Sequence, residues 1–309
     1  MATTITKLFP TGILQANVAF DEVTYSSIKV GTNGVFASQF DEVSLTSGPA
    51  ERKMSNGTYL VKGYFDEVSL LYPTVSYAPI TSATLIFNLD AANFSATPTT
   101  GALDATGTYA LTVNNAGGTI GWNASNGGMF TKSASTASDN IVVGPNTTGT
   151  SYTVFMAYQP QNISSGGQGR ILSCNSGQDW LLGTYAPAPG SGTMYKNVFY
   201  PGAEVWLSHD AADTGWQFIW ATYTYATGVA NLYTASSTVN NTSGPAAPYK
   251  TVTFAANGNR GFNQFLMWAR PGPSEPGQAN IGFIKAYNGA LSLTDIQTLW
   301  STYHSRFGI

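Results

Sequence analysis

Short runs in which apolar and polar residues alternate dominate the chain. They predict β-strands, because successive side chains of a strand point to opposite faces. The clearest run is residues 152–158, where Tyr152, Val154 and Met156 share one face and Phe155 lies on the other. Both faces are largely apolar, which is typical of a strand in the middle of a sandwich. Comparable runs between turn residues predict further strands at 170–175, 179–185, 216–225, 229–234 and 262–268.

The pattern changes near the C-terminal end, where a strand is followed by a short helix. Residues 281–287 alternate, and the Asn-Gly that follows predicts a turn. Ser292 then suits a helix N-cap, and Asp295 stands three positions later, as in a capping box. This predicts a helix at 292–303 that packs against the sandwich. Its buried face is expected to consist of Ile296, Leu299 and Trp300.

The first 80 residues have a different character and contain an internal repeat. The sequence Phe-Asp-Glu-Val begins at Phe20, Phe40 and Phe65, and the last two copies continue identically as Ser-Leu. Asn-Gly turns lie between the copies, so each copy predicts a hairpin or a strand pair, and three such units bury a surface that one alone does not. The Asp-Glu pairs are expected at the rim or in turns, because adjacent residues of a strand point to opposite faces and do not easily share a metal ion.

A proline-interrupted segment at residues 72–79 predicts a linker between two parts of the chain. We therefore expect an N-terminal β-repeat module at 1–80 and a β-sandwich at 81–309. The module carries 12 of the 29 charged residues and has little mass with which to bury a core alone. It is predicted to serve attachment or oligomerisation, the alternative being a small self-contained spacer. The residues expected at assembly contacts are Phe20, Val23, Phe40, Val43, Phe65 and Val68.

The most distinctive motif is the C-terminal succession of a strand, an Asn-Gly turn, a Leu-Ser-x-x-Asp-Ile helix start and a final Arg-Phe-Gly-Ile. With the preceding order of strands, over residues 83–309, it resembles a laminin-G/concanavalin-A-like lectin domain of tailed-bacteriophage structural proteins. The resemblance implies an all-β fold: an antiparallel, concanavalin-like (jelly-roll) β-sandwich closed by one short C-terminal helix. It also implies that a first strand at 83–90 pairs with the strand at 281–287. Another type of sandwich fits the same pattern.

Composition narrows the classes of function. Charged residues make up only 9% of the chain, the net charge is −3 and no basic run is present, so no nucleic-acid partner is expected. No stretch approaches 18 apolar residues, so no membrane partner is expected, and the polar N-terminal residues do not predict a cleaved signal. Cys174 is the only cysteine, which excludes an internal disulfide, and it is expected to be buried.

Catalytic motifs are not found, and we predict no enzymatic activity and no catalytic residue. Retaining glycoside hydrolysis needs two carboxylates about 5 Å apart, which the resemblance would place on a Glu-x-Asp-x-x-Glu strand. After residue 80 the only glutamates are Glu204 and Glu275, and the second lies in a predicted loop. Asp210 and Asp213 are weak candidates for a metal site. They lack the dense oxygen ligands of calcium sites, so a turn is the preferred interpretation and no cofactor is expected.

Aromatic residues with nearby amides suit carbohydrate binding, and one segment of 27 positions, interrupted by Pro and Gly, concentrates them. The alternative is that these aromatic residues fill the core of the sandwich. The carbohydrate-binding candidates are Trp180, Tyr185, Tyr195, Asn197, Tyr200 and Trp206.

These observations and the resemblance together predict a virion structural protein, located in the virion as a capsid decoration, fibre or tail component. The N-terminal module would contact other virion proteins or copies of itself in a homo-oligomer. The lectin-like domain would face outward and bind a host-surface glycan. The alternative is a carbohydrate-binding module or a glycan-active enzyme of concanavalin-like fold.

Overall fold

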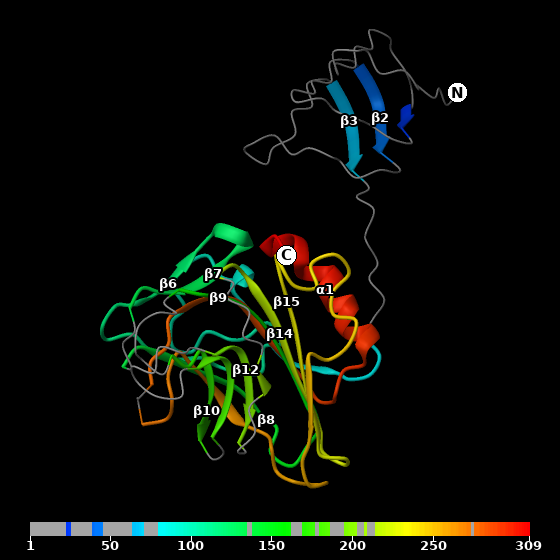
Figure 1. Ribbon diagram of the computed structural model, residues 1–309. Helices are drawn as coiled ribbons and strands as arrows, with labels where there is room; N and C mark the ends of the chain where they lie inside the picture. The colour runs from blue at the N-terminus through cyan, green and yellow to red at the C-terminus, as the bar shows by residue number, and fades with distance from the viewer. Residues whose placement is uncertain are drawn as a thin grey trace. The chain divides into compact units, whose positions relative to one another are not determined.

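The computed structural model describes residues 23–25, 39–45, 64–70, 80–134, 138–161, 169–176, 179–185, 195–202, 207–208, 214–272 and 275–309. The chain divides into two compact units, Met1–Ser76 and Tyr77–Ile309. The described strands form one sheet in the first unit and two sheets in the second (Figure 1). The predicted all-β fold with one C-terminal helix is confirmed.

Each copy of the N-terminal repeat contributes one strand to a 3-stranded parallel sheet. The strands are β1 (Val23–Tyr25), β2 (Gln39–Leu45) and β3 (Tyr64–Leu70). The expected hairpins are wrong for these strands, because parallel neighbours need a crossover connection in place of a tight turn. The Asp-Glu pairs of the second and third copies lie within β2 and β3, so a turn position is wrong for them, while a position at the rim stays a prediction.

The residues predicted to make assembly contacts fall on this sheet where they are described. Equivalent repeat positions pair in register, so that Val23 pairs with Val43, Val43 with Val68 and Phe40 with Phe65. Phe20 lies outside the described residues. The use of these positions in assembly stays a prediction.

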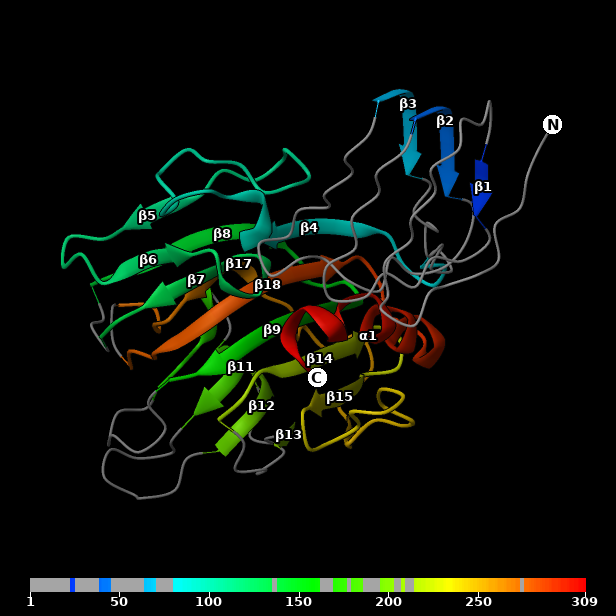
Figure 2. The ribbon, with the colours of Figure 1, turned by 90° about the horizontal axis from the view of Figure 1, so that it is seen from above.

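The second unit is a β-sandwich of two antiparallel sheets with one helix on the outside (Figures 1 and 2). The 7-stranded sheet consists, in spatial order, of β13 (Leu207–Ser208), β12 (Tyr195–Pro201), β11 (Trp180–Tyr185), β10 (Leu172–Ser176), β17 (Asn263–Met267), β8 (Asn140–Asn146) and β5 (Thr112–Asn114). The 8-stranded sheet consists of β16 (Lys250–Thr253), β15 (Val229–Ser236), β14 (Gln217–Thr224), β9 (Tyr152–Pro160), β18 (Ala279–Tyr287), β7 (Met129–Lys132) and β6 (Ile120–Asn123), with β4 (Leu85–Asp90) also paired to β18.

The central position predicted for residues 152–158 is confirmed, because β9 pairs with β14 on one side and with β18 on the other. On one face of β9, Val154 and Met156 join Leu172 and Phe265 of the opposite sheet in the main core. On the other face, Phe155 joins a second core that lies under the C-terminal helix. The strand is therefore buried on both sides, as its two apolar faces predict.

The pairing of the first and last strands of the sandwich is also confirmed. β4 and β18 run antiparallel, with Asp90 opposite Phe283 and Leu89 opposite Ile284. The predicted hairpins of β10 with β11 and of β14 with β15 form as well. Cys174 is buried in the core, as its solitary occurrence predicts.

The C-terminal helix α1 (Leu293–Phe307) packs on the outer face of the 8-stranded sheet, beside β14 and β15 (Figure 1). Ser292 is the N-cap and accepts a hydrogen bond from the Asp295 amide at 3.2 Å. The predicted face of the helix, Ile296, Leu299 and Trp300, is buried, which confirms the prediction. Burial of each of these side chains contributes about 1.5–3 kcal/mol to the stability of the fold.

Charged groups hold the last turn of α1 as well. Arg306 donates to the Asp90 carboxylate at 2.7 Å and to the Gly128 carbonyl at 2.8 Å. Asp90 caps the short 3-10 helix η1 (Ala91–Asn93), and a second one, η2 (Ser125–Gly127), precedes β7. Lys285 on β18 lies nearby, and burial lowers the pKa of Lys285 to about 8.

No helix among the described ranges is both long and apolar enough to cross a membrane.

Candidate functional site

Two of the residues predicted for carbohydrate binding belong to the interior. Trp180 is fully buried, and its indole Nε1 donates to the Tyr152 hydroxyl at 2.9 Å. Asn197 is 1% exposed; its amide oxygen accepts from the Tyr158 hydroxyl and its amide nitrogen donates to Gln217. Both side chains therefore fill the core, the alternative that the sequence left open.

Of the other residues predicted for carbohydrate binding, only some lie close together. Tyr185 is 8% exposed and belongs to a small apolar cluster apart from the main core, against which the half-buried Tyr200 packs. Tyr195 occupies the register position opposite Tyr185 in β12. The Tyr195 side chain and Trp206 lie outside the described residues. Tyr185 is thus the predicted residue around which a site can be built.

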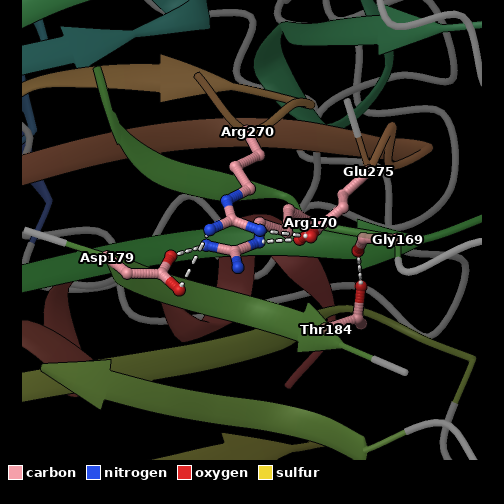
Figure 3. Close-up of polar contacts among 6 residues, drawn as sticks. All are labelled: Gly169, Arg170, Asp179, Thr184, Arg270 and Glu275. Atoms are coloured by element: carbon pink, nitrogen blue, oxygen red, sulfur yellow. Dashed lines mark hydrogen bonds and ion pairs between the residues drawn. The ribbon is translucent and has the colours of Figure 1, made fainter. Parts of the chain in front are cut away.

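A cluster of two arginines and two carboxylates, which the sequence analysis did not single out, lies beside Tyr185. The Arg170 guanidinium is 5.4 Å from the centre of the Tyr185 ring. Arg170 contacts the Asp179 carboxylate at 2.5 Å, and its Nε donates to the Glu275 carboxylate. Arg270 reaches the same two carboxylates, at 2.8 Å for Glu275 and 3.6 Å for Asp179. Figure 3 shows the two guanidinium groups next to each other between the carboxylates.

Distant segments supply this arginine–carboxylate cluster. Arg170 stands at the open end of the β10–β11 hairpin and Asp179 at its turn end, so the Arg170 side chain runs along the hairpin (Figure 3). The Thr184 hydroxyl fixes the backbone there by donating to the carbonyl that precedes Arg170, at 2.6 Å. Arg270 and Glu275 come from the connection between β17 and β18. The cluster therefore joins three connections of the sandwich, those between β9 and β10, between β10 and β11, and between β17 and β18.

The connection between β17 and β18 is held in an unfavourable backbone conformation. Trp268 and Glu275 have φ angles of 63° and 49°, which cost residues other than glycine about 1–3 kcal/mol each. Hydrogen bonds keep Trp268 in place: its amide donates to Ile171, and its carbonyl accepts from the Gly277 amide and from the Lys132 ammonium. Backbone strain of this kind concentrates at functional sites.

Close backbone packing also requires a glycine at the end of this connection. A Cβ atom on Gly277 would lie 2.1 Å from the Arg170 carbonyl oxygen. The Arg170 amide in turn donates to the Glu275 carbonyl at 3.2 Å. The connection that carries Arg270 is therefore fixed to the backbone beside Arg170.

The cluster has a buried base and an exposed rim. The side chains of Arg170 and Glu275 are 2% and 7% exposed, whereas those of Arg270 and Asp179 are 43% and 40% exposed. The hydrogen bond to Glu275 raises the pKa of Arg270, and burial raises the pKa of Tyr185. The buried pair thus fixes a donor, Arg270, and an acceptor, Asp179, at the surface. A rigid donor next to a rigid acceptor is suited to bind a polar ligand.

A cavity and the acidic side chains are the two alternatives to this cluster. A cavity of about 440 Å³ lies between the start of the sandwich and α1, and Leu85, Tyr287 and Tyr303 are among its lining residues. None of its described lining residues carries a charge. Within the described ranges, the structure contains no group of three or more His, Cys, Asp or Glu side chains that could bind a metal ion. Asp210 and Asp213 lie outside those ranges, so their interpretation as a metal site or a turn stays a prediction.

Comparisons with known proteins return distant structural likenesses. No family model and no curated protein matches the sequence. Domain 4 of AbnA, a GH43 extracellular arabinanase from Geobacillus stearothermophilus, in complex with arabinotriose, is 17% identical; the match covers 71% of this chain and 99% of that one, with a TM-score of 0.46. The botulinum neurotoxin serotype D ligand binding domain in complex with N-acetylneuraminic acid is 14% identical, with coverages of 71% and 50% and a TM-score of 0.48. Trypanosoma rangeli sialidase is 13% identical, with coverages of 75% and 34% and a TM-score of 0.48. Similarity this low does not carry a ligand or an activity over to this chain.

Proposed function

We propose that this chain is a virion structural protein of a tailed phage whose β-sandwich binds a host-surface carbohydrate without cleaving it. The observation that supports binding is the rim of the arginine–carboxylate cluster, where Arg270 and Asp179 are half exposed on a buried base. Charged hydrogen-bonding groups held in fixed positions give orientation and specificity to a binding site. Both carboxylates contact both guanidinium groups, an arrangement suited to holding a ligand and not to transferring a proton.

The parallel repeat sheet supports the attachment role that we assign to the N-terminal module. Equivalent positions of successive repeats pair in register. Each of the outer strands, β1 and β3, has one edge that pairs with no other described strand. Edges of this kind pair readily with strands of another chain. The module is therefore proposed to contact copies of itself or other virion proteins.

Carbohydrate binding is tested on a glycan array with the full-length protein. We expect binding that is lost in Arg270→Gln and retained in Lys250→Gln, a matched removal of an exposed positive charge on β16. Incubation of the bound glycans with the protein should release no shorter product. Absence of binding across the array would contradict the proposal, and glycan cleavage would contradict its non-catalytic part.

The attachment role needs a separate experiment, because binding of a glycan does not depend on it. Mass spectrometry of purified particles should detect the chain. Deletion of residues 1–76 should remove it from the particles and lower its oligomeric state in light scattering. A shortened chain that still enters particles would overturn the assignment.

A further inference from the structure

We infer that the arginine–carboxylate cluster binds a neutral sugar through two neighbouring hydroxyl groups and rejects acidic sugars. The inference rests on the proposed carbohydrate-binding function and goes beyond it by naming the class of ligand. It follows from one long contact at the rim of the cluster and from the balance of charge within it.

The long contact joins the two exposed members of the cluster. Arg270 Nη2 and Asp179 Oδ2 are 3.6 Å apart, beyond the usual N–H···O range of about 2.7–3.2 Å. Arg270 Nη1, by contrast, donates a hydrogen bond to Glu275 at 2.8 Å. The rim therefore places an N–H donor and a carboxylate acceptor side by side without joining them by a hydrogen bond. Both side chains are about two-fifths exposed, so a ligand can reach them from the solvent.

A sugar hydroxyl fits this arrangement because it donates and accepts at the same time. One hydroxyl can accept from Arg270 while its neighbour on the next carbon donates to Asp179. A pair of hydroxyls on adjacent carbons thus matches a pair of adjacent protein groups of opposite hydrogen-bonding character. A ligand that keeps only one of the two hydroxyls has to serve both protein groups with a single oxygen or lose one of the two charged hydrogen bonds, and either case costs binding free energy.

The charge balance acts against an acidic ligand. Among the described residues, two carboxylates face two guanidinium groups, so this part of the cluster has no excess positive charge to attract an anion. A ligand carboxylate bound to Arg270 would lie beside the Asp179 carboxylate, and like charges placed together suppress binding. Asp179 cannot easily move aside, because its other contact, at 2.5 Å, is with the buried Arg170. Moving it would deprive a buried charge of one of its two partners, which is costly.

The test measures binding by the full-length protein to three kinds of ligand. These are neutral glycosides with a vicinal diol, the same glycosides lacking one of the two hydroxyls, and glycosides of uronic or sialic acids. We expect the diol to bind, the deoxy analogues to bind about tenfold more weakly or worse, and the acidic sugars not to bind. Arg270→Gln should abolish binding of the diol, while Lys250→Gln should not. Thermal unfolding of each variant checks that the half-exposed Arg270 is replaced without loss of the fold.

The outcomes distinguish failure of the ligand class from failure of the carbohydrate-binding function. Binding of acidic sugars in preference to neutral ones would overturn the inference and leave the carbohydrate-binding function in place. Equal binding of diol and deoxy analogues, or diol binding unchanged in Arg270→Gln in a folded protein, would also overturn it. If no sugar of any class binds, the proposed function itself fails.

Discussion

Arg170 is the residue on which the candidate site depends most. Its guanidinium is almost completely buried and is offset by one buried and one half-exposed carboxylate. A buried ion pair adds little net stability, because desolvation of the charges cancels much of their attraction. Removing Arg170 is different, since the buried Glu275 carboxylate then keeps only the half-exposed Arg270 as a partner.

We therefore expect Arg170→Met to lower the free energy of unfolding of the sandwich by about 3 kcal/mol, the lower end of the cost of breaking a buried pair, because Glu275 loses its buried partner. Urea denaturation followed by tryptophan fluorescence measures the change. The double variant Arg170→Met/Glu275→Met should recover most of the loss. Arg270→Gln, which removes the half-exposed guanidinium, should cost about 1 kcal/mol or less. Equal losses in Arg170→Met and Arg270→Gln would show that burial does not distinguish the two arginines.

The sequence identified only part of the candidate site. Tyr185 was predicted from the concentration of aromatic residues, but its charged neighbours were not. Arg170 pairs with a residue 9 positions away and with another 105 positions away, a relation that no local pattern contains. One clue was available: charged residues are only 9% of the chain, so an arginine or a glutamate next to a predicted strand is uncommon here.

At the scale of elements, α1 shows how a local motif is completed by a distant segment. Ser292 caps the helix as its sequence predicts. The Asp295 carboxylate, however, accepts from the amides of Thr81 and Ser82 and from the Ser82 hydroxyl. The Ser82 hydroxyl in turn accepts from the Ser292 amide at 2.9 Å, the role that a glutamate plays in a capping box. The helix start and the first residues of the sandwich therefore stabilise each other.

We expect Asp295→Ala to lower the free energy of unfolding by about 2 kcal/mol, the range for hydrogen bonds to a charged group. Thr294→Ala, at an exposed position in the same turn, is the control and should change it little. Burial would raise the pKa of Asp295, but the hydrogen bonds from Ser82 and Thr81 outweigh burial and hold that pKa below 3.8. The contribution of a carboxylate with a lowered pKa is present above pH 3.8 and is lost below it. The difference between Asp295→Ala and the parent protein should therefore narrow in strong acid; a difference independent of pH would contradict this account.

The N-terminal strands show that turn residues do not predict which strands pair with each other. The repeat itself was evident, but turn residues between the copies suggested hairpins. Parallel in-register stacking suits repeats for a simple reason: each side-chain position meets its own equivalent in the next strand. A turn motif indicates that the chain changes direction, and does not determine which later strand it returns to.

At the scale of the whole molecule, the boundary between the two units has a measurable consequence. Deletion of residues 1–76 should leave the sandwich with a cooperative transition close to that of the parent protein in differential scanning calorimetry, because its cores lie within Tyr77–Ile309. Deletion of residues 1–84 should lower Tm by about 4–8 °C, since it also removes the partners of Asp295. Equal Tm values for the two truncations would contradict the proposed role of residues 81 and 82.

The sequence by itself determined the class of fold. Alternation at a period of two predicted the strands, two apolar faces predicted the central position of residues 152–158, and a cap followed by an apolar face predicted α1. These properties depend on neighbours within a few positions, where chain geometry leaves few choices. The tertiary structure decided what depends on residues far apart: which aromatic side chains became core, how the repeats pair, and which charges meet. Trp180 and Tyr185 belong to the same strand, yet one is fully buried and the other contacts the cluster of Arg170, because only the packed sheets determine what each face of a strand meets.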